Sequence, residues 1–182
     1  MPLASLAFPT LRKRPRPQLL EFIARLQTLI EADGQIDLDE YCLAKLVQVQ
    51  VIDALNPGAA FARSRVKLVD CIDEARDLFA LIAYYGNDNA ERAKQAFLHA
   101  VEMALPGQVL MYARPDAWQA ALDTALHKLD RLGPPGKELV VRGLTRAISD
   151  DGVVSLAESE LLRVVCAALH CPLPPILRAD AD

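Results

Sequence analysis

The chain has 182 residues, of which 52% are apolar and 5% aromatic, and its formal net charge is −4. A chain of this length can bury a substantial core as one domain. Its net negative charge gives no general attraction to nucleic acid or to an anionic lipid surface. Ala and Leu predominate among the apolar residues, a composition that favours helices packed on helices over β-sheets.

The first 16 residues are predicted to form an extended arm or linker, because they combine prolines with the basic run Arg12-Lys13-Arg14-Pro15-Arg16. These charges follow the first apolar residues, whereas a secretory signal peptide has its charges before them. No apolar run approaches the roughly 18 residues that a membrane span needs. The four cysteines show no Cys-x-x-Cys spacing. We therefore expect a soluble chain in a reducing, cytoplasmic environment.

Two helices are predicted in the N-terminal third. Residues 17–32 carry apolar side chains at helical spacing, and residues 38–55, after Asp37, continue this pattern until Asn56-Pro57-Gly58 interrupts it. The apolar stripe of the first helix consists of Leu19, Phe22, Ile23, Leu26, Leu29 and Ile30.

Five further helices are predicted, each bounded by Gly, Pro or capping residues. Their expected ranges are 64–85, 89–105, 115–132, 137–149 and 156–170. No stretch alternates polar and apolar residues over a strand length, so no sheet is expected. The predicted fold is all-α: a single compact bundle of about seven helices over residues 17–177, followed by a short tail at 178–182.

The most informative feature is a repeated turn. Two segments of nine residues follow the same pattern. The first is Ala32-Asp33-Gly34-Gln35-Ile36-Asp37-Leu38-Asp39-Glu40, and the second is Asp150-Asp151-Gly152-Val153-Val154-Ser155-Leu156-Ala157-Glu158. Both copies follow Asp-Gly-x-[Ile/Val]-[Asp/Ser]-Leu-x-Glu, and both join one apolar helical stretch to the next. A duplicated helix-turn-helix unit is therefore predicted at the two ends of the bundle.

Each turn has two interpretations. In the first, Asp37 and Glu40, and likewise Ser155 and Glu158, form capping boxes in which each side chain accepts from a backbone amide at the helix start. In the second, the carboxylates bind a hard divalent cation, Ca²⁺ or Mg²⁺. The candidate metal ligands are Asp33, Asp37, Glu40, Asp151 and Glu158.

An ordinary EF-hand loop is excluded, because Leu29 and Ala147 occupy the positions of its leading carboxylate. A shared oxygen-rich site requires the two turns to approach each other in the fold. The alternatives of capping and cation binding stay open at the level of sequence.

No catalytic constellation is evident. His99, His127 and His170 are far apart, none lies in an H-E-x-x-H motif, and the chain has no G-x-S-x-G or P-loop. His170-Cys171, before Pro172, has two interpretations, a pair of soft-metal ligands or a structural helix end, and we favour the second. An aromatic group comprising Tyr84, Tyr85, Tyr112 and Trp118 forms a docking patch with Met111 if it is exposed, and ordinary core if it is buried.

The paired acidic turns on a seven-helix plan resemble the tellurite-resistance protein TerB and the wider TerB-like superfamily. A more particular resemblance lies in the run from Asp151 to Arg163 and in Cys171-Pro172-Leu173-Pro174-Pro175. Both are similar to the closing segment of bacterial inner-membrane zinc metallopeptidases of the CAAX-protease-like (HtpX-like) group. Those proteins carry a TerB-like domain behind the protease. This resemblance covers about residues 17–177. It implies a non-catalytic tail domain or a freestanding relative, with cation binding by the acidic residues of its two turns.

Only the two turns and the tail carry that resemblance in detail. The second turn departs from the first, with Ser155 where Asp37 stands, which weakens the implied metal site there. The expected function is an interaction or regulatory domain at the inner face of a bacterial membrane, with a protein partner or an attached metallopeptidase. The alternatives are a small metal-dependent enzyme that uses the acidic turns, and a purely structural helical spacer.

Overall fold

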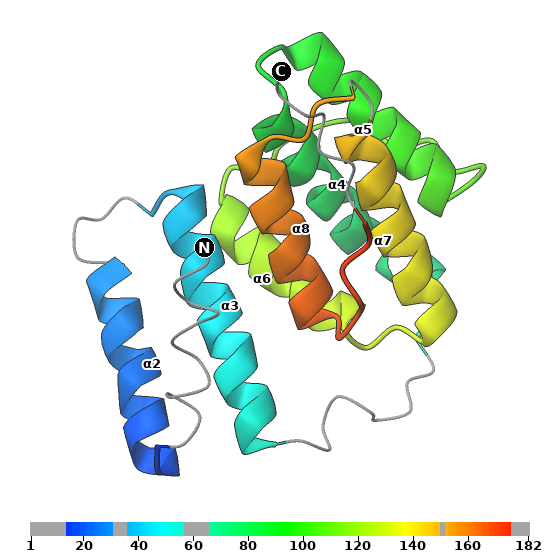
Figure 1. The fold of residues 1–182 in the computed structure, drawn as a ribbon. Coiled ribbons are helices and arrows are strands. Elements are labelled where there is room, and N and C mark those ends of the chain that lie inside the picture. Colours follow the sequence, from blue (N-terminus) through cyan, green and yellow to red (C-terminus); the bar gives the residue numbers. More distant parts are fainter. Residues whose placement is uncertain (1–13, 31–35, 57–65, 150–151, 176–182) are drawn as a thin grey trace. The chain divides into compact units, whose positions relative to one another are not determined.

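The computed structural model describes residues 14–30, 36–56, 66–149 and 152–175 (Figure 1). These residues form seven α-helices and one short 3-10 helix, with a single isolated bridge between Val66 and Leu132 as their only β contact. The predicted all-α class is confirmed. Most of the predicted N-terminal arm and all of the predicted tail lie outside the described ranges. The chain divides into two compact units, residues 1–62 and 63–182, which are described separately.

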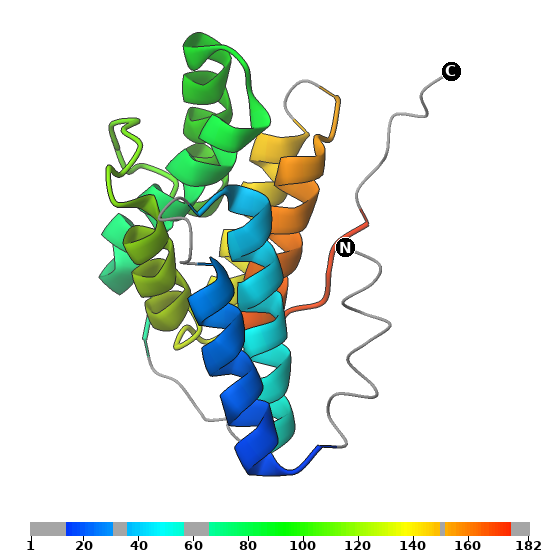
Figure 2. The same cartoon turned by 90° about the vertical axis from the view of Figure 1, so that its left-hand side faces the viewer.

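The first unit contains α2 (Arg16–Ile30) and α3 (Leu38–Leu55), which lie side by side with opposite directions (Figures 1 and 2). Their contact is an apolar cluster of Leu19, Val47 and Val51, with Ile23, Leu26 and Leu55 packed against it. Phe22, which was predicted to belong to the apolar stripe, is 40% exposed. Its position on the helix is at the edge of the stripe that Leu19, Ile23 and Leu26 define.

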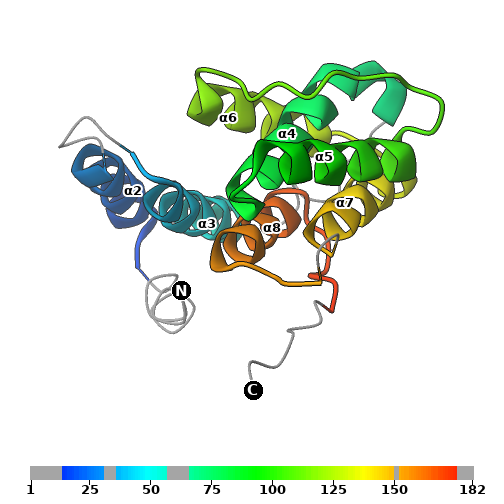
Figure 3. The ribbon, with the colours of Figure 1, turned by 90° about the horizontal axis from the view of Figure 1, so that it is seen from above.

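The second unit is a helical bundle around α4. Its elements are η2 (Leu68–Cys71), α4 (Ile72–Gly86), α5 (Ala90–Ala104), α6 (Trp118–Leu129), α7 (Pro134–Ile148) and α8 (Leu156–Ala168). Helix α4 contacts all four of the other α-helices. Its residues 78–83 are completely buried, as expected for a helix surrounded by neighbours. Figures 1 and 3 show α7 and α8 side by side, the second of the two predicted helical pairs.

Three predicted helix starts were wrong. The helix expected from residue 115 begins only at Trp118, after a turn at residues 116–117. The helix expected from residue 64 begins as an α-helix only at Ile72, after the 3-10 turn η2, in which Asp70 accepts from the Lys67 amide at 3.1 Å. Helix α7 begins at Pro134 and not at Lys137. Pro134 and Pro135 occupy the first turn, where the missing N–H groups would have no helical partner.

Helices α5 and α7 approach closely at Gly143. A Cβ atom there would lie 2.9 Å from Phe79 Cζ and 3.0 Å from both the Ala100 carbonyl oxygen and Ala104 Cβ. The small residues of α5 and this glycine therefore set the spacing of the two helices. None of the described helices has the length and apolar character required to cross a lipid bilayer.

Candidate functional site

The first acidic turn forms a capping box at the start of α3. Asp37 is the N-cap residue, and its Oδ1 accepts from the Glu40 amide at 2.8 Å, while Glu40 Oε2 accepts from the Asp37 amide at 3.3 Å. Both carboxylates thereby satisfy amides that the helix itself leaves without a partner. Asp33 and Gly34 lie outside the described residues.

The second acidic turn forms the equivalent box at the start of α8. Glu158 Oε2 accepts from the Ser155 amide and from Ser155 Oγ, each at 2.8 Å, and Ser155 Oγ accepts from the Glu158 amide at 3.1 Å. Gly152 has a φ of +77°, as predicted for the turn, whereas Asp151 lies outside the described residues. Glu158 is only 3% exposed, whereas Ser155 is half-buried.

Three of the five predicted metal ligands, Asp37, Glu40 and Glu158, are therefore engaged in helix capping. The first turn belongs to the first unit and the second turn to the second unit. Among the described residues, no three His, Cys, Asp or Glu side chains are grouped to hold a metal ion. Cation binding at these turns stays a prediction, and capping is the role that the contacts document.

The predicted aromatic group is partly exposed and is organised by a residue that sequence analysis missed. Arg114 Cζ lies 4.2 Å from the ring centroid of Tyr84 and 5.6 Å from that of Tyr85, and Arg114 Nη2 donates to the Tyr85 hydroxyl at 3.4 Å. Tyr85 also makes an edge contact with Trp118, with centroids 5.7 Å apart. Trp118 is buried, whereas Tyr84 is 42% exposed. One part of the aromatic group is therefore buried in the core, and another part is exposed to solvent.

The connector from α5 to α6, which carries Arg114, has two further exposed side chains. Val109 is 96% exposed and Met111 is 84% exposed. Tyr112 points the other way and packs on Phe97, with ring centroids 5.5 Å apart, and this burial raises the pKa of Tyr112. We define the connector surface as Tyr84, Val109, Met111 and Arg114.

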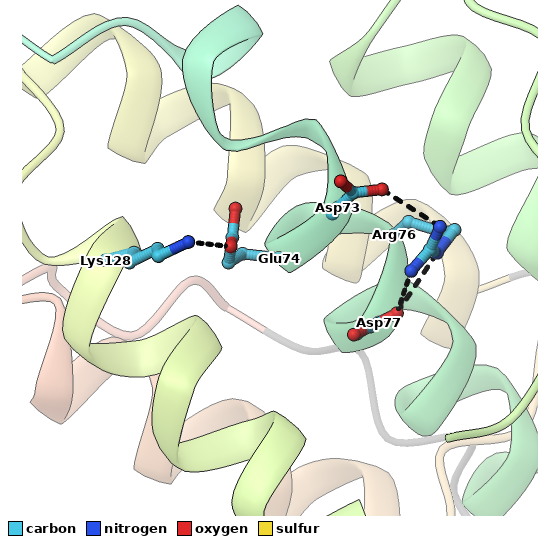
Figure 4. Close-up of polar contacts among 5 residues, drawn as sticks. All are labelled: Asp73, Glu74, Arg76, Asp77 and Lys128. Atoms are coloured by element: carbon cyan, nitrogen blue, oxygen red, sulfur yellow. Dashed lines mark hydrogen bonds and ion pairs between the residues drawn. The ribbon is translucent and has the colours of Figure 1, made fainter.

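Ion pairs of α4 form two separate groups, one within α4 and one between α4 and α6 (Figure 4). The Arg76 guanidinium pairs with Asp73 at 2.9 Å and with Asp77 at 2.8 Å, and the hydrogen bond from Asp77 raises the pKa of Arg76. Lys128 of α6 pairs with Glu74 of α4. Surface pairs of this kind are each worth about 0–1 kcal/mol, and of these three only the Lys128–Glu74 pair joins α6 to α4.

A second polar cluster, also missed by sequence analysis, lies at the end of α8. Asp130 Oδ1 accepts from Lys137 Nζ at 2.7 Å and lies 3.0 Å from His170 Nδ1. Lys137 Nζ also donates to the Leu169 carbonyl at 2.8 Å. The cluster fixes the end of α8 to the segment between α6 and α7.

Comparison with known proteins finds no matching family model, no matching curated protein and no matching solved structure. The TerB-like resemblance consequently rests on the two turns and the C-terminal run of the sequence.

Proposed function

We propose that this chain is a non-catalytic interaction and regulatory domain of the TerB-like kind, attached to or working beside a membrane-bound zinc metallopeptidase on the cytoplasmic side. The observation that carries the proposal is the connector surface. Val109 and Met111 are 96% and 84% exposed on the segment that leads to Arg114, which stacks on Tyr84. Large exposed apolar residues grouped with aromatic and Arg side chains are typical of protein interfaces.

The connector surface also suits recognition energetically. The Arg114 guanidinium is already held by its stacking on Tyr84 and its hydrogen bond to Tyr85. A side chain that is ordered before binding loses less conformational entropy when the partner arrives. Tyr and Arg are the residue types that most often dominate binding energy, while Met adapts to an irregular partner surface.

Site-specific photo-crosslinking tests this proposal. A photoreactive amino acid at position 109 or 111 should form an adduct with a membrane zinc metallopeptidase in the native cell, and Arg114→Ala should reduce the yield. The matched control is position 153, because Val153 is an apolar residue that is 60% exposed outside the connector surface. Equal labelling from all three positions would refute the docking role. Adducts confined to another protein would refute the metallopeptidase as partner.

The regulatory part of the proposal is that Ca²⁺ or Mg²⁺ binds at the acidic turns. Support comes from the Asp and Glu side chains of the turns, whose donor atoms are all oxygen, and from the exposure of Asp37 and Asp39. A cation that binds only the native protein raises the free energy of unfolding by RT ln(1 + [L]/Kd), and the melting temperature rises with it. Calorimetric titration with Ca²⁺, Mg²⁺ and Zn²⁺ should give heat and a matching thermal shift with a hard cation. No heat of binding and no change in melting temperature at millimolar metal would refute cation binding at the acidic turns.

A further inference from the structure

The chain leaves α8 through a tight turn bounded by two cysteines. The Cys171 amide donates to the Cys166 carbonyl at 2.8 Å, and the His170 amide donates to the Ala167 carbonyl at 3.1 Å. This pair of bonds defines a Schellman motif, with Cys166 and Cys171 at the two positions whose side chains usually contact each other. The residue between them, His170, has a φ of 54° and is the only described non-glycine residue with a positive φ.

Neighbouring groups hold this turn from the outside. His170 Nδ1 lies 3.0 Å from Asp130 Oδ1, and Lys137 Nζ donates to the Leu169 carbonyl at 2.8 Å. The Cys171 thiol points back to that same carbonyl, with Sγ 3.6 Å from the oxygen. These contacts therefore hold both the left-handed conformation of His170 and the position of the Cys171 side chain.

The two thiols differ in access. Cys166 is 2% exposed, while Cys171 is half-buried beside the exposed His170. Burial, followed by the nearby Cys171, raises the pKa of Cys166 to about 12. Burial also raises the pKa of Cys171, which the Lys137 ammonium partly opposes. Each thiol therefore stays protonated at neutral pH, and Cys171 is the one that reagents reach first.

We propose that Cys166 and Cys171 form a redox-active pair that closes an intramolecular disulfide across the C-terminal turn of α8. With oxidised glutathione as the oxidant at mildly alkaline pH, Cys171 loses its proton to solvent, and its thiolate attacks one glutathione sulfur and expels a glutathione thiolate. Cys166 then loses its proton to solvent and attacks Cys171 Sγ, which expels the second glutathione thiolate. The two cysteines lose two protons and two electrons, and the oxidant is reduced to two glutathione molecules.

Closure of the disulfide has a local structural consequence. It replaces the bond from the Cys171 thiol to the Leu169 carbonyl, which keeps its partner Lys137. It also fixes His170 in the left-handed region and so sets the direction in which the chain continues to Pro172. The disulfide makes the oxidised turn rigid, whereas the reduced turn is held by hydrogen bonds alone.

Peptide mass mapping tests the pair directly. The native protein is treated with oxidised glutathione at mildly alkaline pH, quenched with acid, alkylated under denaturing conditions and digested with trypsin. Both cysteines fall in one peptide, because Arg163 and Arg178 flank them. This peptide should lose two hydrogens and carry no alkyl group. The peptides that contain Cys42 and Cys71 should be fully alkylated.

Serine variants identify the order of events. Cys166→Ser should leave Cys171 as a persistent glutathione adduct, and Cys171→Ser should leave Cys166 unmodified. Cys71→Ser is the matched control, since Cys71 is also buried and its pKa is also raised, and it should leave disulfide formation unchanged. A persistent glutathione adduct on wild-type Cys171, a disulfide between two chains, or equal oxidation of Cys71 would overturn the proposal. The wild-type peptide mass decides the question even if a serine variant fails to fold.

Discussion

The side chain of Glu158, in the first turn of α8, lies against Gly86, the last residue of α4. A Cβ atom at position 86 would come 2.1 Å from Glu158 Oε1 and 2.4 Å from its carboxyl carbon. The carboxylate is not free to move aside, because it accepts two hydrogen bonds from Ser155 and is buried. The second acidic turn therefore fastens α8 to the end of α4 in addition to capping its own helix.

Gly86→Ala should consequently destabilise the protein. The added methyl group forces the Glu158 carboxylate out of its capping box, and overpacking of this kind costs about 1–3 kcal/mol. Urea denaturation measures the loss. In a Glu158→Ala background the same glycine substitution should cost little, because the clash has been removed. Equal losses in both backgrounds would show that the contact with Glu158 is not responsible.

Gly143→Ala should also destabilise, through the contact of α7 with α5. Alanine is intrinsically about 0.5–1 kcal/mol better than glycine inside a helix. At Gly143 that gain is outweighed, because the Ala100 carbonyl at 3.0 Å is backbone and cannot turn away. Gly136→Ala on the same helix is the control, since its nearest contact is Leu132 Cβ at 3.4 Å. Urea midpoints should fall for Gly143→Ala and hold or rise for Gly136→Ala.

Substitutions at Asp37 separate capping from cation binding. Asn is as good an N-cap residue as Asp, whereas Ala costs about 1 kcal/mol. If the Asp37 side chain serves only as a cap, Asp37→Asn should keep wild-type stability and Asp37→Ala should lose that amount, with no effect of Ca²⁺ on either. A thermal shift with Ca²⁺ in the wild type that disappears in Asp37→Asn would instead establish a metal role. Paired melting curves with and without metal distinguish the two cases.

Local signals explain what could be predicted from the sequence. The start of α3 after Asp37 and the start of α8 after Ser155 were predicted correctly, because a capping box is contained within four residues. The placement of Glu158 over Gly86 was not predicted, since these residues meet only through the packing of two helices distant in sequence. The same applies to the stacking of Arg114 on Tyr84.

The end of α8 illustrates a different reason for failure. A Schellman motif usually has glycine at its left-handed position, and this glycine makes the motif recognisable in a sequence. Here that position is His170. Its conformation is supported by Asp130, which lies 40 residues earlier in the chain. No local pattern therefore marks the turn, and the pairing of Cys166 with Cys171 becomes evident only in the folded protein.

Position 170 gives a direct test of this turn. A left-handed conformation costs a non-glycine residue about 1–2 kcal/mol, and Ala, unlike His, has no side chain to bond Asp130. His170→Ala should therefore be clearly less stable than the wild type. His170→Gly loses the same bond to Asp130 but avoids the backbone cost, so it should be more stable than His170→Ala by about 1 kcal/mol. Equal stability of the two variants would show that φ at this position is not fixed in solution.

The buried Cys166 thiol predicts how stability changes at alkaline pH. Burial raises the pKa of Cys166 from its ordinary value of 9.0 to about 12. Below pH 9 the thiol is protonated in both the folded and the unfolded chain, and its contribution to stability is complete. Above pH 9 the unfolded chain loses this proton first, so the free energy of unfolding falls by at most about 1.4 kcal/mol per pH unit until the folded thiol also ionises.

Denaturation under reducing conditions between pH 8 and 11 measures this dependence. Cys166→Ala should lower stability at pH 8 because it leaves a cavity, but its decline with pH should be shallower than that of the wild type. Val165→Ala is the matched control, since it removes a buried neighbour that does not titrate. Its curve should run parallel to the wild-type curve. A Cys166→Ala curve that is also parallel would show that this thiol does not set the alkaline limit of the fold.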